Sequence, residues 1–527
     1  MSQELNLSLP LEVAMNDELL VNHLANLLQI STDINLIKFR KLKQSIDARS
    51  RQIKVNLKVE VSKSEQLPPL ISYSKSYPDV SHKPQIIIVG SGPAGLFAAI
   101  RAIELGFKPI VLERGEDVRA RRRDLAAINK DHIVNPESNY CFGEGGAGTY
   151  SDGKLYTRAN KRGDIKRILE ILVANGAAEN ILYEAHPHIG TNKLPALIAN
   201  IRNSIIEAGG EVHFNTKVVD FIIKNNEIKG VITENGKEYI GIGTVLATGH
   251  SARDIFELCL KKGIYIEKKP FAVGVRIEHP QNVIDQSQYH CESRNPLLPA
   301  ASYSLVTQTN VKGVQRGVFS FCMCPGGFIV PSATAPNEIV VNGMSPSRRD
   351  SKFANSGLVV SIEEEDLKPF SAFGALAGLE LQKNIEQKAG RLVNFKQTAP
   401  AQRVLDFVKK KISSELNETS YQPGLASMDM RAVLPEHIAA PLSMGLLDFG
   451  KKIRNYVNND AQLIGIESRT SSPVRILRDK ESGEHVQINR LYPSGEGAGY
   501  AGGIMSAALD GTFIVEQLIK KYGTIHQ

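Results

Sequence analysis

Residues 85–115, QIIIVGSGPAGLFAAIRAIELGFKPIVLERG, contain the pattern that decides the fold. Four apolar residues predict a buried strand at 86–89, and a Gly-x-Gly-x-x-Gly turn follows at 90–95. An amphipathic helix is predicted for 96–105, and a second apolar strand ends at Glu113. A β-α-β unit with an acidic residue about 20 positions after the turn is typical of a dinucleotide-binding site. The alternative is a glycine-rich turn in another kind of α/β sheet.

Each glycine of this turn has a separate physical task. Gly90 permits the tight bend, Gly92 lets the backbone approach a pyrophosphate, and Gly95 lets the helix pack close to the strand. The first helical turn directs free N–H groups toward the phosphates. Glu113 can accept hydrogen bonds from a ribose.

The chain has 527 residues, which is enough for about two or three domains with a large core. Its apolar content of 42% and charged content of 23% are typical of a soluble protein. No apolar run reaches the ~18 residues of a membrane-spanning helix, and the first residues show no secretory signal. We therefore expect no membrane association and a cytoplasmic location. The five cysteines are few and odd in number, which favours reduced thiols over a disulfide framework.

Residues 1–80 are predicted to form a small basic α+β domain that ends in a linker. A helix is indicated at 16–28 and an alternating strand at 52–61, with 34–45 as the antiparallel neighbour of that strand. The segment 38–63 holds nine Lys and Arg residues against two acidic residues, so it accounts for the whole net charge of +7. Such a patch can bind phosphates, an anionic membrane or nucleic acid, or it is the solvated face of a sheet.

Two further glycine-rich segments lie far along the chain. Residues 143–149, GEGGAGT, carry four glycines in six positions, which suits a backbone that wraps a ligand better than a flexible surface loop. Residues 495–503, GEGAGYAGG, lead into a long apolar helix at 504–521. A strand that ends in Ala-Thr-Gly at 247–249 passes near the same ligand. The arginine-rich segment 116–130 is expected to be a surface helix.

A ligand lined by all of these glycine-rich segments must be long, and FAD fits this requirement better than NAD alone. No second β-Gly-x-Gly-x-x-Gly-α unit for NAD(P)H follows in the sequence. NAD(P)H as the electron donor is therefore left open. The predicted fold is α/β, with a discontinuous Rossmann-like FAD-binding domain at 84–250 and 485–527. An inserted α+β substrate domain at 251–484 and the small N-terminal α+β domain complete it.

The chain resembles the bacterial family of uncharacterised FAD-dependent dehydrogenases, within the flavoprotein superfamily that shares a glutathione-reductase-like FAD domain. The matching stretches are 87–96, 142–154, 467–475 and 495–503, and the likeness runs over nearly the whole chain. The resemblance implies FAD as the cofactor but no particular substrate. The full predicted set of cofactor-binding residues is Gly90, Ser91, Gly92, Pro93, Ala94, Gly95, Glu113, Arg114, Gly145, Gly146, Val218, Thr248, Gly249, Gly495, Glu496 and Gly497.

Candidate catalytic residues must lie near the flavin ring, because the flavin performs the redox step and the protein orients the substrate. Lys154 can place a positive charge there, or it is an exposed loop lysine. Arg469 and Arg475 can clamp a carboxylate or phosphate, or they form structural salt bridges. Cys322 and Cys324 form either a redox pair or, as we favour, two packed core cysteines. Zinc would need a second such pair, so we predict no metal site.

These features predict an FAD-dependent oxidoreductase that transfers a hydride between flavin and a small organic substrate. One alternative is a flavoprotein that binds or modifies RNA through the basic N-terminal domain. The absence of an aromatic-rich stacking surface in that domain argues against it, so nucleic acid is not the expected partner. The other alternative is a non-catalytic FAD-binding scaffold. The sequence indicates no oligomeric state.

Overall fold

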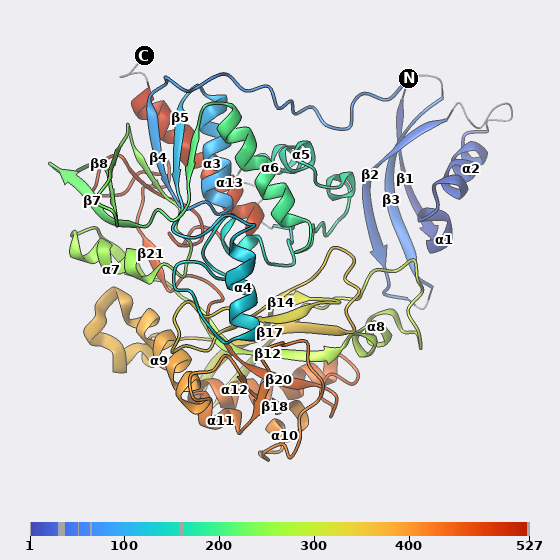
Figure 1. Ribbon diagram of the computed structural model, residues 1–527. Helices are drawn as coiled ribbons and strands as arrows, with labels where there is room; N and C mark the ends of the chain where they lie inside the picture. Colours follow the sequence, from blue (N-terminus) through green and yellow to red (C-terminus); the bar gives the residue numbers. More distant parts are fainter. Residues whose placement is uncertain (1, 30–36, 51, 64–65, 158–162, 524–527) are drawn as a thin grey trace.

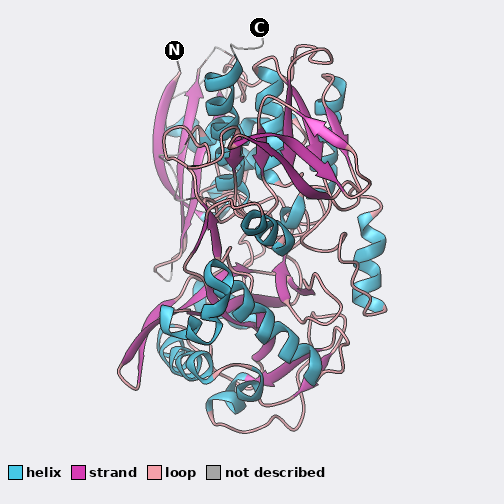
Figure 2. Ribbon diagram, turned by 90° about the vertical axis from the view of Figure 1, so that its left-hand side faces the viewer, coloured by secondary structure: helices cyan, strands magenta, loops and turns pink. Residues whose placement is uncertain are grey.

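The computed structural model describes residues 2–29, 37–50, 52–63, 66–157 and 163–523. Figure 1 shows three parts, which are a small N-terminal sheet, a parallel sheet covered by helices, and a large sheet with its own helices below. A view turned by 90° shows the upper and lower parts as separate layers (Figure 2). Among the described helices, none has both the length and the apolar character needed to cross a membrane.

The parallel sheet is the α/β core that the sequence predicts. Its strand order is β22-β10-β4-β5-β6, and each neighbouring pair is parallel. The strands are β4 (Gln85–Val89), β5 (Lys108–Leu112), β6 (Glu211–His213), β10 (Thr244–Leu246) and β22 (Leu491–Pro493). Because β22 comes from the end of the chain, the sheet is complete only when two distant segments meet. The predicted discontinuous α/β fold class is confirmed.

The two faces of this sheet are covered by different elements. Ile86 and Ile88 belong to a buried cluster with residues of four helices, whereas Ile87 and Val89 belong to a cluster with residues of a β-meander and of the helix at 253–261. Successive strand residues point to opposite faces, so a strand buried on both sides needs a continuous apolar run. The first face carries α3 (Pro93–Glu104), α5 (Ile165–Ala174), α6 (Leu194–Glu207) and α13 (Ile504–Tyr522). The second carries β7 (Val218–Lys224), β8 (Glu227–Thr233), β9 (Glu238–Ile240) and α7 (Arg253–Lys261).

The N-terminal sheet has the order β1-β3-β2, and both pairs are antiparallel, as predicted for the central strand and its neighbour. Its elements are β1 (Gln3–Pro10), α1 (Leu11–Ala14), α2 (Asp17–Leu27), β2 (Lys38–Asp47) and β3 (Lys54–Ser62). Asn16 caps α2, because its side-chain oxygen accepts the N–H groups of Glu18 and Leu19. The start of the predicted neighbour strand, at 34–36, lies outside the described residues.

Residues 66–84 lead to the parallel sheet in a largely extended conformation (Figure 1). Glu170 of α5 holds this segment, because one carboxylate oxygen accepts the backbone N–H groups of Ser72 and Tyr73 at 3.2 and 3.0 Å. The linker that the proline and serine content indicates is thus fixed to the surface of the parallel-sheet layer.

The third part is built on a seven-stranded sheet of order β13-β14-β17-β12-β20-β18-β19. Its strands are β12 (Ala272–Pro280), β13 (Val306–Val311), β14 (Val314–Cys324), β17 (Phe353–Ser361), β18 (Ala399–Arg403), β19 (Leu425–Ser427) and β20 (Gln462–Glu467). Its helices are α8 (Gln281–Tyr289), η4 (Glu364–Leu376), α9 (Ala377–Leu392), α10 (Val404–Val408), α11 (Met430–Val433) and α12 (Glu436–Lys452). Two small antiparallel pairs complete it, which are β11 (Ile266–Lys268) with β21 (Val474–Ile476), and β15 (Phe328–Pro331) with β16 (Val341–Met344).

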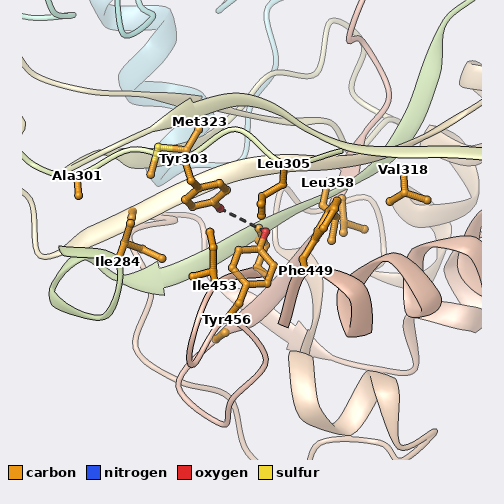
Figure 3. Packing of buried hydrophobic residues seen from close by; sticks show 14 of the residues in the cluster. Ile284, Ala301, Tyr303, Leu305, Val318, Met323, Leu358, Phe449, Ile453 and Tyr456 are labelled. Carbon is orange, nitrogen blue, oxygen red and sulfur yellow. Dashed lines mark hydrogen bonds between the residues drawn. The ribbon is translucent and has the colours of Figure 1, made fainter. Parts of the chain in front are cut away.

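Aliphatic and aromatic side chains fill the core beneath the seven-stranded sheet, and Figure 3 shows three of the aromatic ones, Tyr303, Phe449 and Tyr456. The hydroxyl of Tyr456 donates to that of Tyr303 at 3.4 Å, and the two rings meet edge to face at 5.5 Å. The buried hydroxyls therefore have a partner inside the core. His279 extends this group, because its ring centroid lies 4.8 Å from that of Tyr456 and its Nε2 lies 2.8 Å from the Tyr456 carbonyl oxygen.

His279 is fully buried, and burial lowers its pKa from 6.5 to about 4. As the pH falls from 6.5 to about 4, the unfolded chain takes up a proton on His279 before the folded protein does. His279 therefore lowers the free energy of unfolding progressively in this pH range. The shift corresponds to about 3 kcal/mol. We expect the free energy of unfolding of His279→Gln to fall less than that of the wild type between about pH 7 and about pH 4.5. Urea unfolding at both pH values measures this, and equal losses in the two proteins would contradict it.

Candidate functional site

Four turns meet at the carboxyl-terminal edge of the parallel sheet. Gly90 follows β4, and Glu113 follows β5. Thr248 and residues 494–497 follow β10 and β22. Open parallel sheets bind their ligands outside this edge. The segments that the sequence predicts as ligand-binding therefore converge where the fold favours a ligand.

In the first turn, protein packing requires Gly90 and Gly95 but leaves Gly92 free. Gly90 has a φ of +103°, and a Cβ on Gly95 would lie 1.9 Å from the Gly90 carbonyl oxygen. A Cβ on Gly92 would meet no protein atom within 4 Å. Gly92 is also the N-cap of α3, and Pro93 is the first residue of that helix. The N-terminus of α3 therefore opens onto space in which phosphates can approach free N–H groups.

The second glycine-rich segment packs directly on this first turn. The N–H of Gly145 donates to the carbonyl oxygen of Ser91 at 3.0 Å, and a Cβ on Gly146 would lie 3.3 Å from the Cα of Gly92. Gly145 and Gly146 have φ values of +76° and +59°, which favour glycine. Gly146 then begins the short helix η2 (Gly146–Gly148). The two glycine-rich segments therefore form one surface.

The carboxylate of Glu113 connects the first turn to the second glycine-rich segment through hydrogen bonds. Its Oε2 accepts the N–H and the hydroxyl of Ser91 at 3.0 and 2.8 Å. Its Oε1 accepts the N–H groups of Gly115 and Gly143, both at 3.0 Å. The sequence predicts that Glu113 binds a ribose, yet these four donors already use its acceptor positions. A ribose hydroxyl would have to replace the Ser91 hydroxyl, so the task of Glu113 that the structure shows is to hold the turns together.

Arg121 shows where the expected surface helix differs from the structure. It begins α4 (Arg121–Lys130), but its side chain is fully buried. Its Nε and Nη1 donate to the carbonyl oxygens of Asn139 and Glu144 at 2.7 and 2.9 Å. A Cβ on Gly143 would lie 2.5 Å from the Arg121 Cδ. One buried guanidinium thus shapes the second glycine-rich segment from behind, and a run of charged residues cannot reveal this.

The turn after β22 is anchored by Asp510 of α13, a residue that sequence reasoning missed. Its Oδ2 accepts the N–H of Gly495 at 2.7 Å, and Arg478 donates to both of its oxygens at 2.6 and 3.0 Å. The turn then reaches the one after β10, because a Cβ on Gly497 would lie 2.4 Å from the carbonyl oxygen of Gly249. Gly497 and Gly249 therefore bring the two turns into direct backbone contact.

Glu496 and His250 face one another across these two turns, with Nε2 of the histidine 4.0 Å from Oε1 of the glutamate. Burial raises the pKa of Glu496 to about 7. Burial also lowers the pKa of His250 to about 4, and the charges of Arg469 and Arg253 add to this effect. At neutral pH a neutral imidazole thus lies beside a carboxyl group close to its titration midpoint. Such strongly perturbed neighbouring groups are typical of functional sites.

Val218 and Arg114, two further residues of the predicted set, lie near Glu113. The N–H of Thr216 donates to the Glu113 carbonyl oxygen at 2.8 Å, and Val218 begins β7 two residues later. Arg114 lies over the Phe142 ring at 4.5 Å from its centroid. Its Nη2 is 2.6 Å from a carboxylate oxygen of Asp254, so its charge is already paired.

Lys154 follows the second glycine-rich segment and reaches the seven-stranded sheet. Its Nζ donates to the carbonyl oxygen of Met323 and lies 3.9 Å from the Cys322 Sγ and 3.8 Å from Asp152 Oδ2. Burial alone would lower the pKa of Lys154, but the charges of Cys322 and Asp152 raise it. The side chain keeps 38% of its surface exposed. These contacts hold the Lys154 ammonium group between the second glycine-rich segment and the seven-stranded sheet.

The two candidate arginines have the contacts of structural salt bridges. Arg469 is buried, and its Nη2 lies 2.7 Å from Glu338 and 3.0 Å from Glu386. Arg253 donates to the same two carboxylates at 2.8 Å each, which gives a buried cluster of two arginines and two glutamates. Arg475 is 37% exposed and pairs with Glu267 across β11 and β21 at 3.1 Å. In the described part of the chain, no three or more His, Cys, Asp or Glu side chains are grouped to hold a metal ion.

Three protein families match this chain. Residues 1–62 match a domain of unknown function (DUF8436), residues 85–123 an FAD binding domain, and residues 270–470 the family "FAD-dependent protein, C-terminal domain-like". An uncharacterised protein of Clostridium beijerinckii is 41% identical over 500 residues, which cover 91% of this chain and 92% of that protein. The chain belongs to this family of FAD-dependent proteins. The predicted resemblance is confirmed, and FAD is the cofactor of this oxidoreductase-type flavoprotein.

Other similarities of the flavoprotein are shorter or weaker. A thiamine thiazole synthase of Aeropyrum pernix is 29% identical over 148 residues, which cover 28% of this chain and 42% of that enzyme. A glycine oxidase structure from Bacillus cereus is 14% identical and covers 83% of this chain and 96% of that one, with a TM-score of 0.31. Similarity of this extent does not indicate a substrate for the flavoprotein.

Proposed function

We propose that the flavoprotein transfers a hydride between FAD and a small organic substrate that binds beside Lys154. The observation that carries the proposal is the convergence of four turns around an open helix N-terminus at Gly92. The N–H groups there suit a pyrophosphate, and Gly145 and Gly146 lie close enough to contact the same phosphates. The turn at 495–497 would extend this surface toward the flavin end of the cofactor.

Bound FAD would supply the two-electron chemistry, and the residues of the chain would bind and orient the substrate. Lys154 is the best placed of the candidates, because its ammonium group can hold an anionic part of the substrate. The segment that presents it is rigid, since Arg349 donates to both carboxylate oxygens of Asp152 at 3.1 and 2.6 Å. Asp152 and Arg349 would therefore keep the Lys154 charge at one position.

Several finer assignments belong to the same proposal. The segment 251–484 would form the substrate domain, between FAD-binding parts at 84–250 and 485–527, and residues 1–80 would be a separate small domain. NADH or NADPH would be the electron donor, although no second dinucleotide motif is present in the sequence. A cytoplasmic location is consistent with five free cysteines.

The N-terminal domain does not favour the RNA-binding alternative. Four of its basic side chains form ion pairs within the domain, which are Arg40 with Glu60, Lys41 with Asp17, Arg49 with Asp47, and Lys58 with Glu4. Paired cations contribute less to the counterion-releasing contacts with phosphates that dominate nucleic-acid affinity. We therefore do not propose an RNA substrate.

Anaerobic bleaching of the flavin absorbance tests the proposed function directly. The purified full-length protein would be mixed with NADH, NADPH and a library of small metabolites, and spectra would be recorded after each addition. We expect at least one compound to reduce the flavin stoichiometrically. A protein that dithionite reduces, but that no nicotinamide or metabolite reduces, would instead support the non-catalytic scaffold.

Lys154→Met should keep its FAD but slow substrate-driven bleaching at least about tenfold, which corresponds to about 1.4 kcal/mol of transition-state stabilisation. The matched control is Lys229→Met, because Lys229 is 41% exposed and also forms an ion pair, with Glu227 at 2.8 Å. The control should bleach at the wild-type rate. Equal rates in both variants would remove Lys154 from the proposed site.

A further inference from the structure

Cys322 and Cys324 lie at an irregular end of β14. The pairing of β14 with β17 shifts register between Phe321 and Cys324, and Cys322 has a φ of +43°, which is uncommon for a residue other than glycine. Cys322 is partly exposed, whereas Cys324 is fully buried. The Cys324 thiol donates to the Cys322 carbonyl oxygen at 3.3 Å. A hydrogen bond therefore links the two cysteines, which are two residues apart, and only Cys322 is partly exposed.

Two cations flank this pair. Lys154 Nζ lies 3.9 Å from the Cys322 Sγ, and Arg276 Nη2 lies 3.8 Å from the Cys324 Sγ and 2.7 Å from the Cys322 carbonyl oxygen. The Arg276 side chain is completely buried and pairs with Glu467 at 2.8 Å. The neighbouring Cys324 thiol, together with the charges of Lys154 and Arg276, holds the pKa of Cys322 well below its usual value. The neighbouring Cys322, together with burial, raises the pKa of Cys324.

An accessible thiolate beside a buried thiol is the arrangement expected of a reactive dithiol, and it is not expected of two inert core cysteines. Cys259 provides the contrast inside this chain. It is buried in an apolar cluster, and burial raises its pKa to about 12. The sequence favoured the interpretation of Cys322 and Cys324 as packed core cysteines. Cys259 has the environment expected of a packed core cysteine, whereas Cys322 does not.

The pair also faces the proposed FAD site. Lys154, which contacts Cys322, follows directly on the glycine-rich segment that packs against Gly92. On the other side, the charge of Cys322 contributes to the raised pKa of Glu496, in the turn after β22. Cys322, at the end of β14 in the seven-stranded sheet, is thus connected through Lys154 to the segment that would hold the cofactor.

The geometry points to a second redox centre, in which Cys322 and Cys324 interconvert between a dithiol and a disulfide by exchanging two electrons with the bound flavin. On oxidation one Sγ–Sγ bond forms between the Cys322 thiolate and the Cys324 thiol, which loses its proton. The two electrons and that proton pass to the oxidised flavin, and the reverse transfer cleaves the bond. This inference rests on the proposed function only in that FAD is the electron partner.

Anaerobic reductive titration of the air-oxidised holoprotein with dithionite tests the inference without any substrate. The wild type should consume twice the reductant that its flavin alone requires, because the disulfide accepts two further electrons. Cys322→Ser and Cys324→Ser should each consume only the amount that the flavin requires. Cys291→Ser is the matched control, since Cys291 is also partly exposed and free, and it should behave as the wild type.

Alkylation of the denatured wild type, followed by mass measurement, gives an independent readout. Before reduction, two of the five cysteines should resist alkylation, and after reduction all five should react. Five reactive cysteines in the oxidised protein, or a reductant requirement equal to that of the flavin alone, would overturn the inference even if both serine variants fail to fold. Failure of the proposed function is distinct, because the metabolite library would then not bleach the flavin while the electron count stays doubled.

Discussion

Gly92→Val is expected to give a folded protein without FAD. Gly92 has a φ of −70° and a ψ of −178°, which any residue can adopt, and a Cβ there would meet no protein atom within 4 Å. The valine side chain would instead occupy the open space in front of the α3 N-terminus and cover the N–H groups that suit a phosphate. The purified variant should be colourless, with a circular dichroism spectrum and a melting temperature equal to those of wild-type apoprotein.

Gly95→Val is the matched change three residues later. It should lower the stability of the apoprotein, which Gly92→Val should leave unchanged. A Cβ on Gly95 would lie 1.9 Å from the Gly90 carbonyl oxygen. Gly90 itself lies close to the backbone of Ala247, since a Cβ on it would lie 2.4 Å from the Ala247 carbonyl oxygen. Overpacking of this kind costs about 1–3 kcal/mol or more, so the apoprotein itself should melt at a lower temperature. A yellow Gly92→Val protein would contradict the proposed position of the pyrophosphate.

Arg469→Met is expected to destabilise the fold by about 3–5 kcal/mol, because it leaves buried carboxylates short of a cation. Glu338 and Glu386 would then share Arg253 alone. Ser468 would still donate to Glu386, but one hydrogen bond does not replace a charge. Urea unfolding of the apoprotein measures this loss, which is separate from any effect on the flavin.

Arg475→Met provides the control for this second prediction. Arg475 and its partner Glu267 are 37% and 36% exposed, so water screens the pair and its loss should cost less than about 1 kcal/mol. If Arg469→Met instead kept its stability and lost only substrate-driven bleaching, the salt-bridge interpretation would be wrong. Arg469 would then again be a candidate catalytic residue.

The parts of the fold that the sequence predicts correctly depend on neighbours in the chain. The strand, turn and helix around Gly90 and Gly95 follow from local periodicity and backbone geometry, and they agree with β4 and α3. Asn16 likewise caps α2 through N–H groups only two and three residues away. Such short-range rules need no knowledge of the rest of the fold.

The residues that the sequence pattern misplaces have partners elsewhere in the chain. Arg121 looks like a surface residue until the carbonyl groups of Asn139 and Glu144 surround it. Asp510 lies within an apolar helix, and only the return of β22 to the parallel sheet places Gly495 within its reach. Whether a charged side chain is buried depends on which distant groups neutralise it.

Residues 85–115, together with the glycine-rich segments at 143–149 and 495–503, were sufficient to predict an FAD-binding α/β protein. The reason is that glycine, apolar runs and helix termini impose their geometry locally. The chemistry beside the cofactor site depends on tertiary structure, because Lys154 and Cys322 are 168 residues apart and meet only through folding. The charge state of a thiol is determined by the cations around it, and the order of residues in the chain does not specify those neighbours.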